Sequence, residues 1–136
     1  MIFDHGWTQM DTDKKKIIHE EKTFHIIGCA MNVMNILGHG FLEKVYENAL
    51  TVEFREKNIP FAQQPRYAIH YKDMVIGEYI PDLVAYDEII LDTKVIDKIT
   101  NVQKAQMINY LKTTNRKVGI ILNFKNPRLE WERIIL

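Results

Sequence analysis

Apolar residues in the first part of the chain have the spacing of one face of a helix. From about Glu20 to Leu37 they recur in steps of three and four residues, which predicts a first helix. Its expected inner face consists of Phe24, Ile27, Met31, Met34 and Leu37. Residues 1–16 show little pattern, so we expect a loosely ordered lead-in there.

A second helical pattern follows the segment Gly38-His39-Gly40. Two glycines within three residues disfavour a helix and permit a sharp reversal of the chain. The next apolar positions predict a helix over roughly residues 41–57, which the segment Asn58-Ile59-Pro60 ends. Its expected inner residues are Leu42, Val45, Tyr46, Ala49, Leu50 and Phe54.

The middle of the chain changes to patterns that are typical of β-strands. Residues 67–71 alternate in polarity, and Lys72-Asp73 has the composition of a turn. Residues 75–85 predict one or two further strands, interrupted at Gly77. A β-hairpin is then predicted over residues 80–94, because the polar segment Tyr86-Asp87-Glu88 divides two apolar runs.

The last third of the chain predicts a helix between strands. Thr100 and Gln103 have the spacing of a capping box, which would open a helix that runs to about Lys112. Residues 118–124 are nearly all apolar and predict a buried strand, and residues 133–136 predict a last one. A hairpin that feeds a helix and then a buried strand implies an α/β fold, with a mixed central sheet flanked by helices.

Length and composition match one ordinary globular domain, which we place at residues 17–136. The chain has 136 residues, of which 46% are hydrophobic and 26% are charged. No apolar run approaches the roughly 18 residues that cross a bilayer, and the N-terminus lacks a signal-peptide pattern. Cys29 is the only cysteine, which excludes an internal disulfide. We therefore expect a cytoplasmic protein with no membrane partner.

The net charge of zero conceals an uneven distribution. Residues 1–93 contain 9 basic and 15 acidic residues, a net charge of −6, whereas residues 94–136 contain 9 basic and 3 acidic residues, a net charge of +6. An acidic region beside a basic flank suits a metal site next to a phosphate backbone. The alternative is that the basic residues only keep a helix and a loop in contact with water, as runs of charged residues usually do. The candidate phosphate contacts are Lys98, Lys104, Lys112 and Arg116.

The predicted hairpin carries three residues that are able to do chemistry, namely Asp82, Asp92 and Lys94. Side chains alternate along a strand, so Asp92 and Lys94 are expected on one face and Thr93 on the other. Two converging acids repel unless a cation lies between them, and a nearby lysine is able to hold a phosphate or a nucleophilic water. This combination indicates metal-dependent phosphodiester cleavage. The alternative is a structural ion pair between Lys94 and either acid.

The segment from Gly40 to Tyr46, GFLEKVY, matches the GxxExxY signature. From roughly Phe24 onward, the chain resembles the small bacterial proteins named after that motif, which belong to the PD-(D/E)xK nuclease-like superfamily. The other segments that carry the resemblance are YENAL, Tyr71-Lys72-Asp73, Pro81-Asp82-Leu83-Val84, Asp92-Thr93-Lys94 and ILNF. The resemblance implies a restriction-endonuclease-like αβββαβ core with an extra N-terminal helix, and the predicted order of elements contains that core.

The resemblance also implies roles for individual residues. Asp82, Asp92 and Lys94 would be catalytic, and Mg²⁺ or Mn²⁺ would be held by Glu43, Asp82, Asp92 and the backbone carbonyl of Thr93. The bound metal would acidify the attacking water, which Lys94 would orient. Asp92 stands where the family usually carries glutamate, although some superfamily nucleases have the D-x-K form.

A second motif of the superfamily lies on the helix after the hairpin. Gln106 and Tyr110 form a QxxxY match, and residues four apart share one helix face. In the exonuclease-like branch, this motif contacts the substrate backbone beside the metal. The alternative is a capped amphipathic helix in which Tyr110 is half-buried.

The function expected from these observations is metal-dependent hydrolysis of phosphodiester bonds in DNA. A homodimer is also expected, because small nucleases of this type often pair and the apolar first helix offers a surface. The alternative is a nuclease-fold module with little or no catalysis, which binds nucleic acid or another protein. The aspartate at position 92, the zero net charge and the small size favour that alternative.

Overall fold

The computed structural model describes the backbone of residues 10–136 and the side chains of residues 20–136. Helix α1 (Met10–Leu37) begins well before Glu20, so residues 10–16 of the predicted lead-in are helical, and residues 1–9 lie outside the described range. Helix α2 (Glu43–Glu56) follows, as predicted. The later elements are β1 (Phe61–Gln63), β2 (Tyr67–Tyr71), β3 (Met74–Tyr79), β4 (Leu83–Ala85), β5 (Ile89–Lys94), α3 (Asn101–Thr114), β6 (Val118–Asn123) and β7 (Glu130–Ile135).

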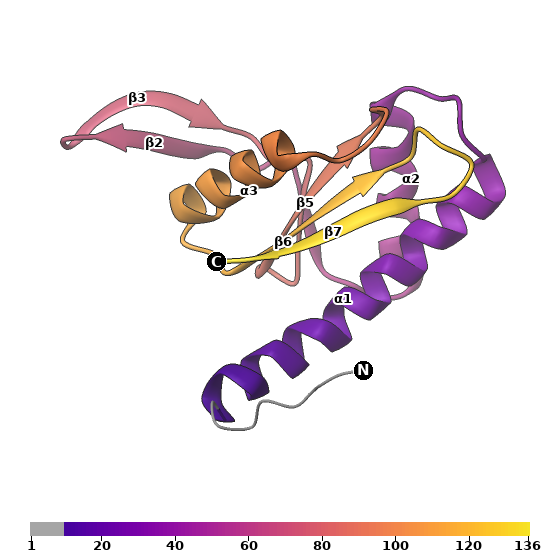
Figure 1. Ribbon diagram of the computed structural model, residues 1–136, viewed down its shortest axis with the longest axis horizontal. Helices are drawn as coiled ribbons and strands as arrows, with labels where there is room; N and C mark the ends of the chain where they lie inside the picture. The colour runs from indigo at the N-terminus through magenta and orange to yellow at the C-terminus, as the bar shows by residue number, and fades with distance from the viewer. Residues whose placement is uncertain (1–9) are drawn as a thin grey trace.

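The main sheet is mixed, with the strand order β1-β4-β5-β6-β7. Figure 1 shows β5, β6 and β7 beside one another in this sheet. Strands β5 and β6 are parallel, and the other neighbouring pairs are antiparallel. A parallel connection needs a crossover, which α3 supplies. The predicted α/β fold is confirmed, and the αβββαβ core consists of α2, β1, β4, β5, α3 and β6.

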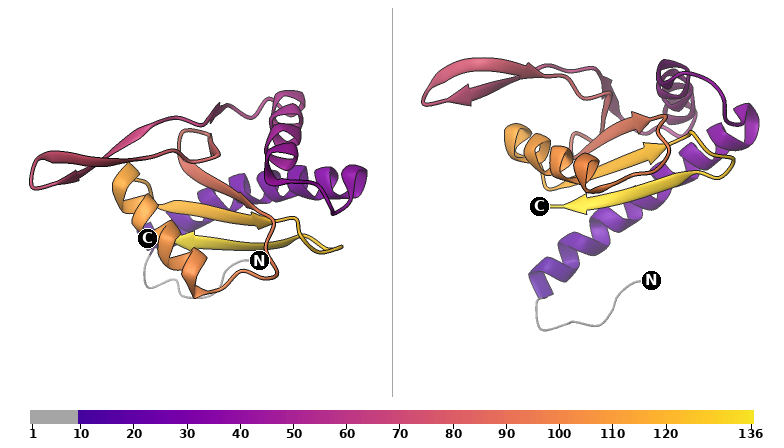
Figure 2. Two further views of the ribbon diagram at one scale, coloured as in Figure 1. Left: turned by 90° about the horizontal axis from the view of Figure 1, so that it is seen from above. Right: turned by 45° about the horizontal axis from the view of Figure 1, so that its top comes forward.

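The structure corrects which three strands open that core. The sequence predicted residues 67–71 as the first of them, but β2 and β3 pair only with each other in a separate two-stranded sheet. This ribbon projects away from the main sheet (Figures 1 and 2). Its turn at Lys72 and Asp73 has positive φ at both residues, as tight hairpin turns require. The true first strand is β1, whose three residues are too few to show a period in the sequence.

Helices cover the two faces of the main sheet. Helices α1 and α2 pack with Ile89 and Leu91 of β5, whereas α3 packs with Ile90. Side chains alternate along a strand, so Asp92 and Lys94 share the face of Ile90, and Thr93 shares the face of Leu91. Figure 2 shows α3 and the long α1 on opposite sides of the sheet. In the described part of the chain, none of the helices is long and apolar enough to cross a membrane.

The inner faces of α1 and α2 differ from the predicted ones. Ile27 and Met34 are buried as predicted, but Phe24 is 76% exposed and Met31 is 46% exposed. Apolar side chains occur on most sides of this helix, so more than one of its faces shows apolar residues three and four positions apart. The buried residues of α1 are Thr23, Ile26, Ile27, Cys29, Ala30, Val33 and Met34.

In α2, the predicted inner residues Tyr46, Leu50 and Phe54 are fully buried, but Leu42 lies before the helix and is 80% exposed. The Tyr46 ring stacks on the Phe124 ring, with 4.5 Å between the ring centroids.

The hydroxyl of Tyr46 ties the start of α2 to the preceding loop. It donates a hydrogen bond to the Gly38 carbonyl (2.7 Å) and accepts one from the Phe41 N–H (3.1 Å). Gly38 and Gly40 have φ values of 71° and 116°, which glycine adopts without strain. The tyrosine therefore fixes the loop that leads into Glu43.

We expect the substitution Tyr46→Phe to lower the free energy of unfolding by about 1–2 kcal/mol, because it removes the two hydrogen bonds that join this buried side chain to the backbone of the loop. Urea denaturation followed by circular dichroism measures this change. Tyr71→Phe is the matched control, since Tyr71 is 60% exposed and its loss should change stability by less than about 0.5 kcal/mol. Equal effects of the two substitutions would contradict the anchoring role of Tyr46.

Candidate functional site

The predicted acids and lysine lie together at one end of the β4–β5 hairpin. Antiparallel pairing of Leu83 with Leu91 places the start of β4 beside the end of β5. Asp82 therefore lies next to the segment that holds Asp92 and Lys94. Glu43 reaches the same place from the first turn of α2, because its Oε2 accepts a hydrogen bond from the Val95 N–H (3.2 Å). The fold thus brings the four residues to one end of the sheet.

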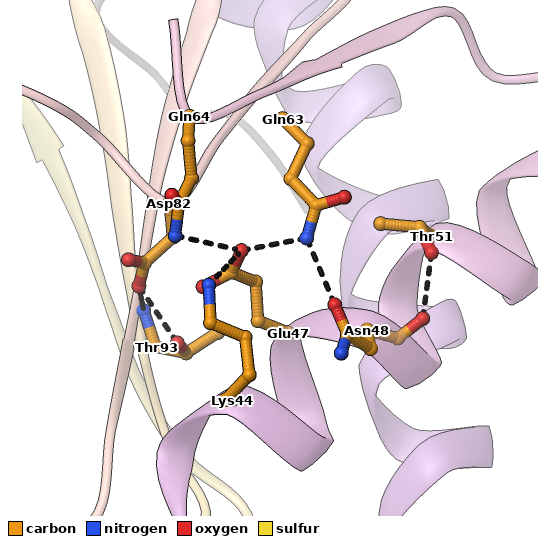
Figure 3. Close-up of polar contacts among 8 residues, drawn as sticks. All are labelled: Lys44, Glu47, Asn48, Thr51, Gln63, Gln64, Asp82 and Thr93. Carbon is orange, nitrogen blue, oxygen red and sulfur yellow. Dashed lines mark hydrogen bonds and ion pairs between the residues drawn. The ribbon is translucent and has the colours of Figure 1, made fainter.

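Thr93 orients the carboxylate of Asp82. Its N–H and its hydroxyl both donate to Asp82 Oδ2, each at 2.7 Å (Figure 3). Thr93 is 1% exposed, so both of its donors are shielded from solvent, while Asp82 itself is half-buried. Both bonds use the same oxygen, and Oδ1 takes no part in them. The sequence predicted only a backbone carbonyl role for Thr93, and that role stays a prediction.

Asp92 and Lys94 form an ion pair with 3.4 Å between Oδ2 and Nζ. Burial raises the pKa of Asp92 to about 6, and Asp82 and Glu43 act in the same direction, while Lys94 opposes them. Burial alone would lower the pKa of Lys94, but Asp92, Glu43 and Asp82 outweigh it and raise that pKa. The lysine is therefore protonated at neutral pH. It is suited to hold an anion or a water, and it is not suited to accept a proton.

An aromatic stack lies beside the acids. Tyr79 is 8% exposed, and its ring stacks on that of Tyr110 with 3.8 Å between centroids and 9° between planes. Burial raises the pKa of Tyr79, and the charge of Asp92 raises it further. Tyr110 is half-buried, and the role of the QxxxY motif stays a prediction. Gln106 lies one turn earlier on α3 and is exposed.

The sequence did not single out two buried polar residues near the site. Glu47 is 2% exposed, and its Oε2 accepts hydrogen bonds from Lys44, Gln63 and Gln64. Its position four residues after Glu43 places both acids on the same side of α2, and this spacing was an available signal.

Asn123 is the second buried polar residue near the site that the sequence did not single out. It ends β6 and is fully buried. Its side chain accepts from the Ile96 N–H (3.1 Å) and donates to Glu130 (2.8 Å). It thereby fixes the loop that follows Lys94. No sequence pattern marks such a bridge, because its partners are distant along the chain.

The four basic residues that the sequence offered as candidate phosphate contacts differ in their partners and exposure. Arg116 donates to the Asp87 carboxylate (2.7 Å) at the turn of the β4–β5 hairpin, which is the end opposite Asp82. Arg116 therefore forms its ion pair at the opposite end of the hairpin from the candidate site. Lys104 pairs with Glu132 at 3.7 Å, whereas Lys98 and Lys112 are exposed.

The carboxylates fit a metal that keeps part of its water shell. Among the described residues, no group of three or more His, Cys, Asp or Glu side chains is close enough to hold a metal by itself. Mg²⁺ is commonly bound by one or two carboxylates, with water and substrate phosphate completing the shell. Asp82 Oδ1, which accepts no hydrogen bond among those of the described residues, and the carboxylate of Asp92 match that smaller requirement. Burial is the main cause of the raised pKa of Asp92, and the charges of Asp82 and Glu43 add to it, so a bound cation would stabilise the ionised form of this acid.

Comparison with known families identifies this arrangement. Residues 20–134 match the family described as the PD-(D/E)XK nuclease superfamily. The chain belongs to the PD-(D/E)XK nuclease superfamily. Its Pro81-Asp82 and Asp92-Thr93-Lys94 segments are the parts of this chain that have the form of the motif in that name. Nucleases of this superfamily typically use divalent metal ions.

A solved structure supports the fold. The protein described as "Crystal structure of SSO0001" aligns with 68% of this chain at 18% sequence identity and a TM-score of 0.54. The alignment covers 48% of that protein, so this chain spans about half of its length. Among curated proteins, no sequence matches this chain. The nuclease-like fold is therefore shown by both the family and the structure.

The raised pKa of Asp92 leads to a prediction about stability and pH. The folded chain binds this proton more tightly than the unfolded chain, since the pKa rises from 3.8 to about 6. This contribution to stability is complete below pH 3.8 and is lost as the pH rises through about 6. Asp92→Asn should therefore gain about 1–3 kcal/mol of unfolding free energy, relative to the wild type, between pH 4 and pH 8.

Urea denaturation in EDTA at several pH values measures that gain. Asp97→Asn is the control, because the side chain of Asp97 is 99% exposed and its substitution should show no comparable dependence on pH. A constant difference between Asp92→Asn and the wild type across this range would contradict the electrostatic description of the site.

Proposed function

We propose that this chain is a divalent-metal-dependent nuclease that hydrolyses phosphodiester bonds in DNA. The observation that carries the proposal is the gathering of Asp82, Asp92 and a protonated Lys94 at one strand end of a PD-(D/E)XK fold. We also propose Glu43 and the Thr93 carbonyl as further metal ligands, since both lie at this end of β5.

The residues have separable tasks in this reaction. Asp82, oriented by Thr93, and Asp92, ionised above about pH 6, would hold Mg²⁺ or Mn²⁺. The bound ion would lower the pKa of the attacking water and offset the charge on the phosphate. Lys94 would hold that water or a phosphate oxygen in line, because its raised pKa keeps it a hydrogen-bond donor.

The preference for nucleic acid rests on the flank of the site. Lys98 precedes α3, and Lys112 lies in its last turn, so positive charge is present at both ends of the helix that carries the QxxxY motif. Exposed Gln106 is available to a phosphate or sugar group. Tyr110 would contribute through its stack with Tyr79 at the edge of the site.

The rival proposal is a binding module that retains the nuclease fold without catalysis. The ion pair between Lys94 and Asp92 favours it, because the lysine neutralises one acid without a metal. The two proposals differ in metal affinity. A catalytic site must bind a divalent ion when substrate is present, whereas the module needs none.

The test is cleavage of supercoiled, linear and single-stranded DNA in Mg²⁺, Mn²⁺ or EDTA. We expect cleavage only with metal, and we expect Asp82→Ala and Lys94→Ala each to reduce the rate on the order of 100-fold or more. The matched controls are Asp97→Ala and Lys57→Ala, which remove an exposed acid and an exposed lysine.

The controls should cut at the wild-type rate. If the wild type cuts none of these substrates, or if the Asp82 and Lys94 variants cut as well as the controls, the nuclease proposal is wrong for these substrates. The binding module would then be the better description.

The QxxxY motif has its own test. Gln106→Ala should raise KM for DNA about fivefold and leave kcat within about twofold, because a lost hydrogen bond to a backbone group is worth about 1 kcal/mol. Asn101→Ala is the control, since Asn101 is an exposed amide five positions earlier and faces another side of α3. Steady-state kinetics on the best DNA substrate gives both constants. An unchanged KM for Gln106→Ala would leave Gln106 without a role in substrate binding.

A further inference from the structure

Glu47 is a buried acid that the proposed reaction does not use. It is 2% exposed, and it forms an ion pair with Lys44, whose own side chain is 56% exposed. Burying a carboxylate is costly unless hydrogen bonds replace its water. Three donors meet its Oε2, namely Lys44 Nζ (3.1 Å), Gln63 Nε2 (2.7 Å) and Gln64 Nε2 (3.3 Å). Two of these donors come from the end of β1.

The end of β1 leads from Glu47 to Asp82. Gln64 is the residue directly after β1, and its backbone N–H donates to the Asp82 carbonyl (3.0 Å). Its side chain reaches back to Glu47, as Figure 3 shows. Gln64 holds this geometry with a φ of 52°, in the left-handed region that glutamine seldom adopts. The hydrogen bond to Glu47 thus helps to keep an unfavourable conformation at the residue that holds Asp82.

Gln63 strengthens the same link. It is paired with Leu83, the residue after Asp82, and its side chain donates to both Glu47 and Asn48 (2.7 and 2.9 Å). The backbone around Asp82 is therefore attached to α2 through two adjacent glutamines. On its other side, the Asp82 carboxylate is attached to β5 through Thr93.

We propose that Glu47 is a positioning residue for Asp82. It contacts none of the reacting atoms, and it acts through Gln63 and Gln64 to hold the start of β4 where the Asp82 carboxylate meets Thr93. A metal ligand must be held within about 0.5 Å of its productive position, so a support of this kind bears directly on metal affinity. The catalytic consequence rests on the proposed nuclease function, whereas the mechanical link does not.

The charge of Glu47 is part of the proposal. Hydrogen bonds to a carboxylate are roughly twice as strong as those to a neutral amide, and all three donors converge on one oxygen. Glu47→Gln keeps the size of the side chain and one acceptor oxygen, so the variant should fold while its hold on the glutamines weakens. Gln64→Asn breaks the link from the other side, because asparagine tolerates a positive φ but has a shorter side chain.

The matched control is Asn48→Ala. Asn48 is the next residue on α2 and also accepts from Gln63, but it makes no hydrogen bond to Gln64 among those of the described residues. A general loosening of α2 against β1 would appear in this variant too. The loss of a specific link from Glu47 through Gln64 to Asp82 would not appear in Asn48→Ala.

Two measurements on the full chain test the proposal. The first is amide hydrogen exchange of Thr93, whose N–H bonds to Asp82, measured by NMR without metal. The second is the Mn²⁺ concentration that half-saturates DNA cleavage, together with KM for DNA. Glu47→Gln and Gln64→Asn should each speed exchange at Thr93 and raise the half-saturating Mn²⁺ concentration by about tenfold, with KM for DNA within about twofold. Asn48→Ala should leave all three near the wild-type values.

Unchanged exchange at Thr93 in both Glu47→Gln and Gln64→Asn would overturn the proposal. Equal effects in Asn48→Ala would also overturn it, because they would show a merely structural role for this part of α2. If the wild type cuts no DNA with any metal, the proposed nuclease function fails. Exchange at Thr93 still decides in that case whether Glu47 holds Asp82 in place.

Discussion

Strand β5 is hydrogen-bonded on both sides, antiparallel to β4 and parallel to β6, and the rest of the structure depends on its register. Its first three residues, Ile89-Ile90-Leu91, are fully buried between the two helical layers. The same register sets the faces of Asp92, Thr93 and Lys94. A slip of one residue would exchange these faces and move Thr93 away from Asp82. Hydrophobic packing in one half of the strand therefore specifies the polar geometry in the other half.

The polar half of β5 buries Asp92 within the influence of Asp82 and Glu43. The ion pair with Lys94 lowers the pKa of Asp92, but burial outweighs it, and this pKa still rises to about 6. Thr93 and Gln64 hold Asp82 by its carboxylate and by its backbone, and thereby keep the acids near each other. Such an arrangement lowers stability, and proteins commonly carry that cost at sites that act on charged substrates. The proposed nuclease function would give this arrangement a chemical purpose.

The sequence predicted those elements that depend on interactions between residues close together along the chain. The β4–β5 hairpin follows from two apolar runs around a turn, and the capping box at α3 is present, with the Thr100 N–H donating to Gln103 (2.8 Å). Strand β1 has three residues, and only its pairing with β4 makes it a strand, so the sequence did not reveal it. Glu47 was not predicted for a related reason, because its partners Gln63 and Gln64 belong to that same strand end. Family resemblance located the acids, but it did not show what holds them.

The sequence positions of the site residues have a consequence for the order of folding. Asp82, Asp92 and Lys94 belong to a single hairpin, and hairpins form within about 1–10 μs. Glu43, in contrast, reaches Val95 across 52 residues, and such distant contacts form late because a long loop must close first. We therefore expect the pair of acids to assemble in a chain that is still largely unfolded. The docking of α2 would complete the site in one of the last steps of folding.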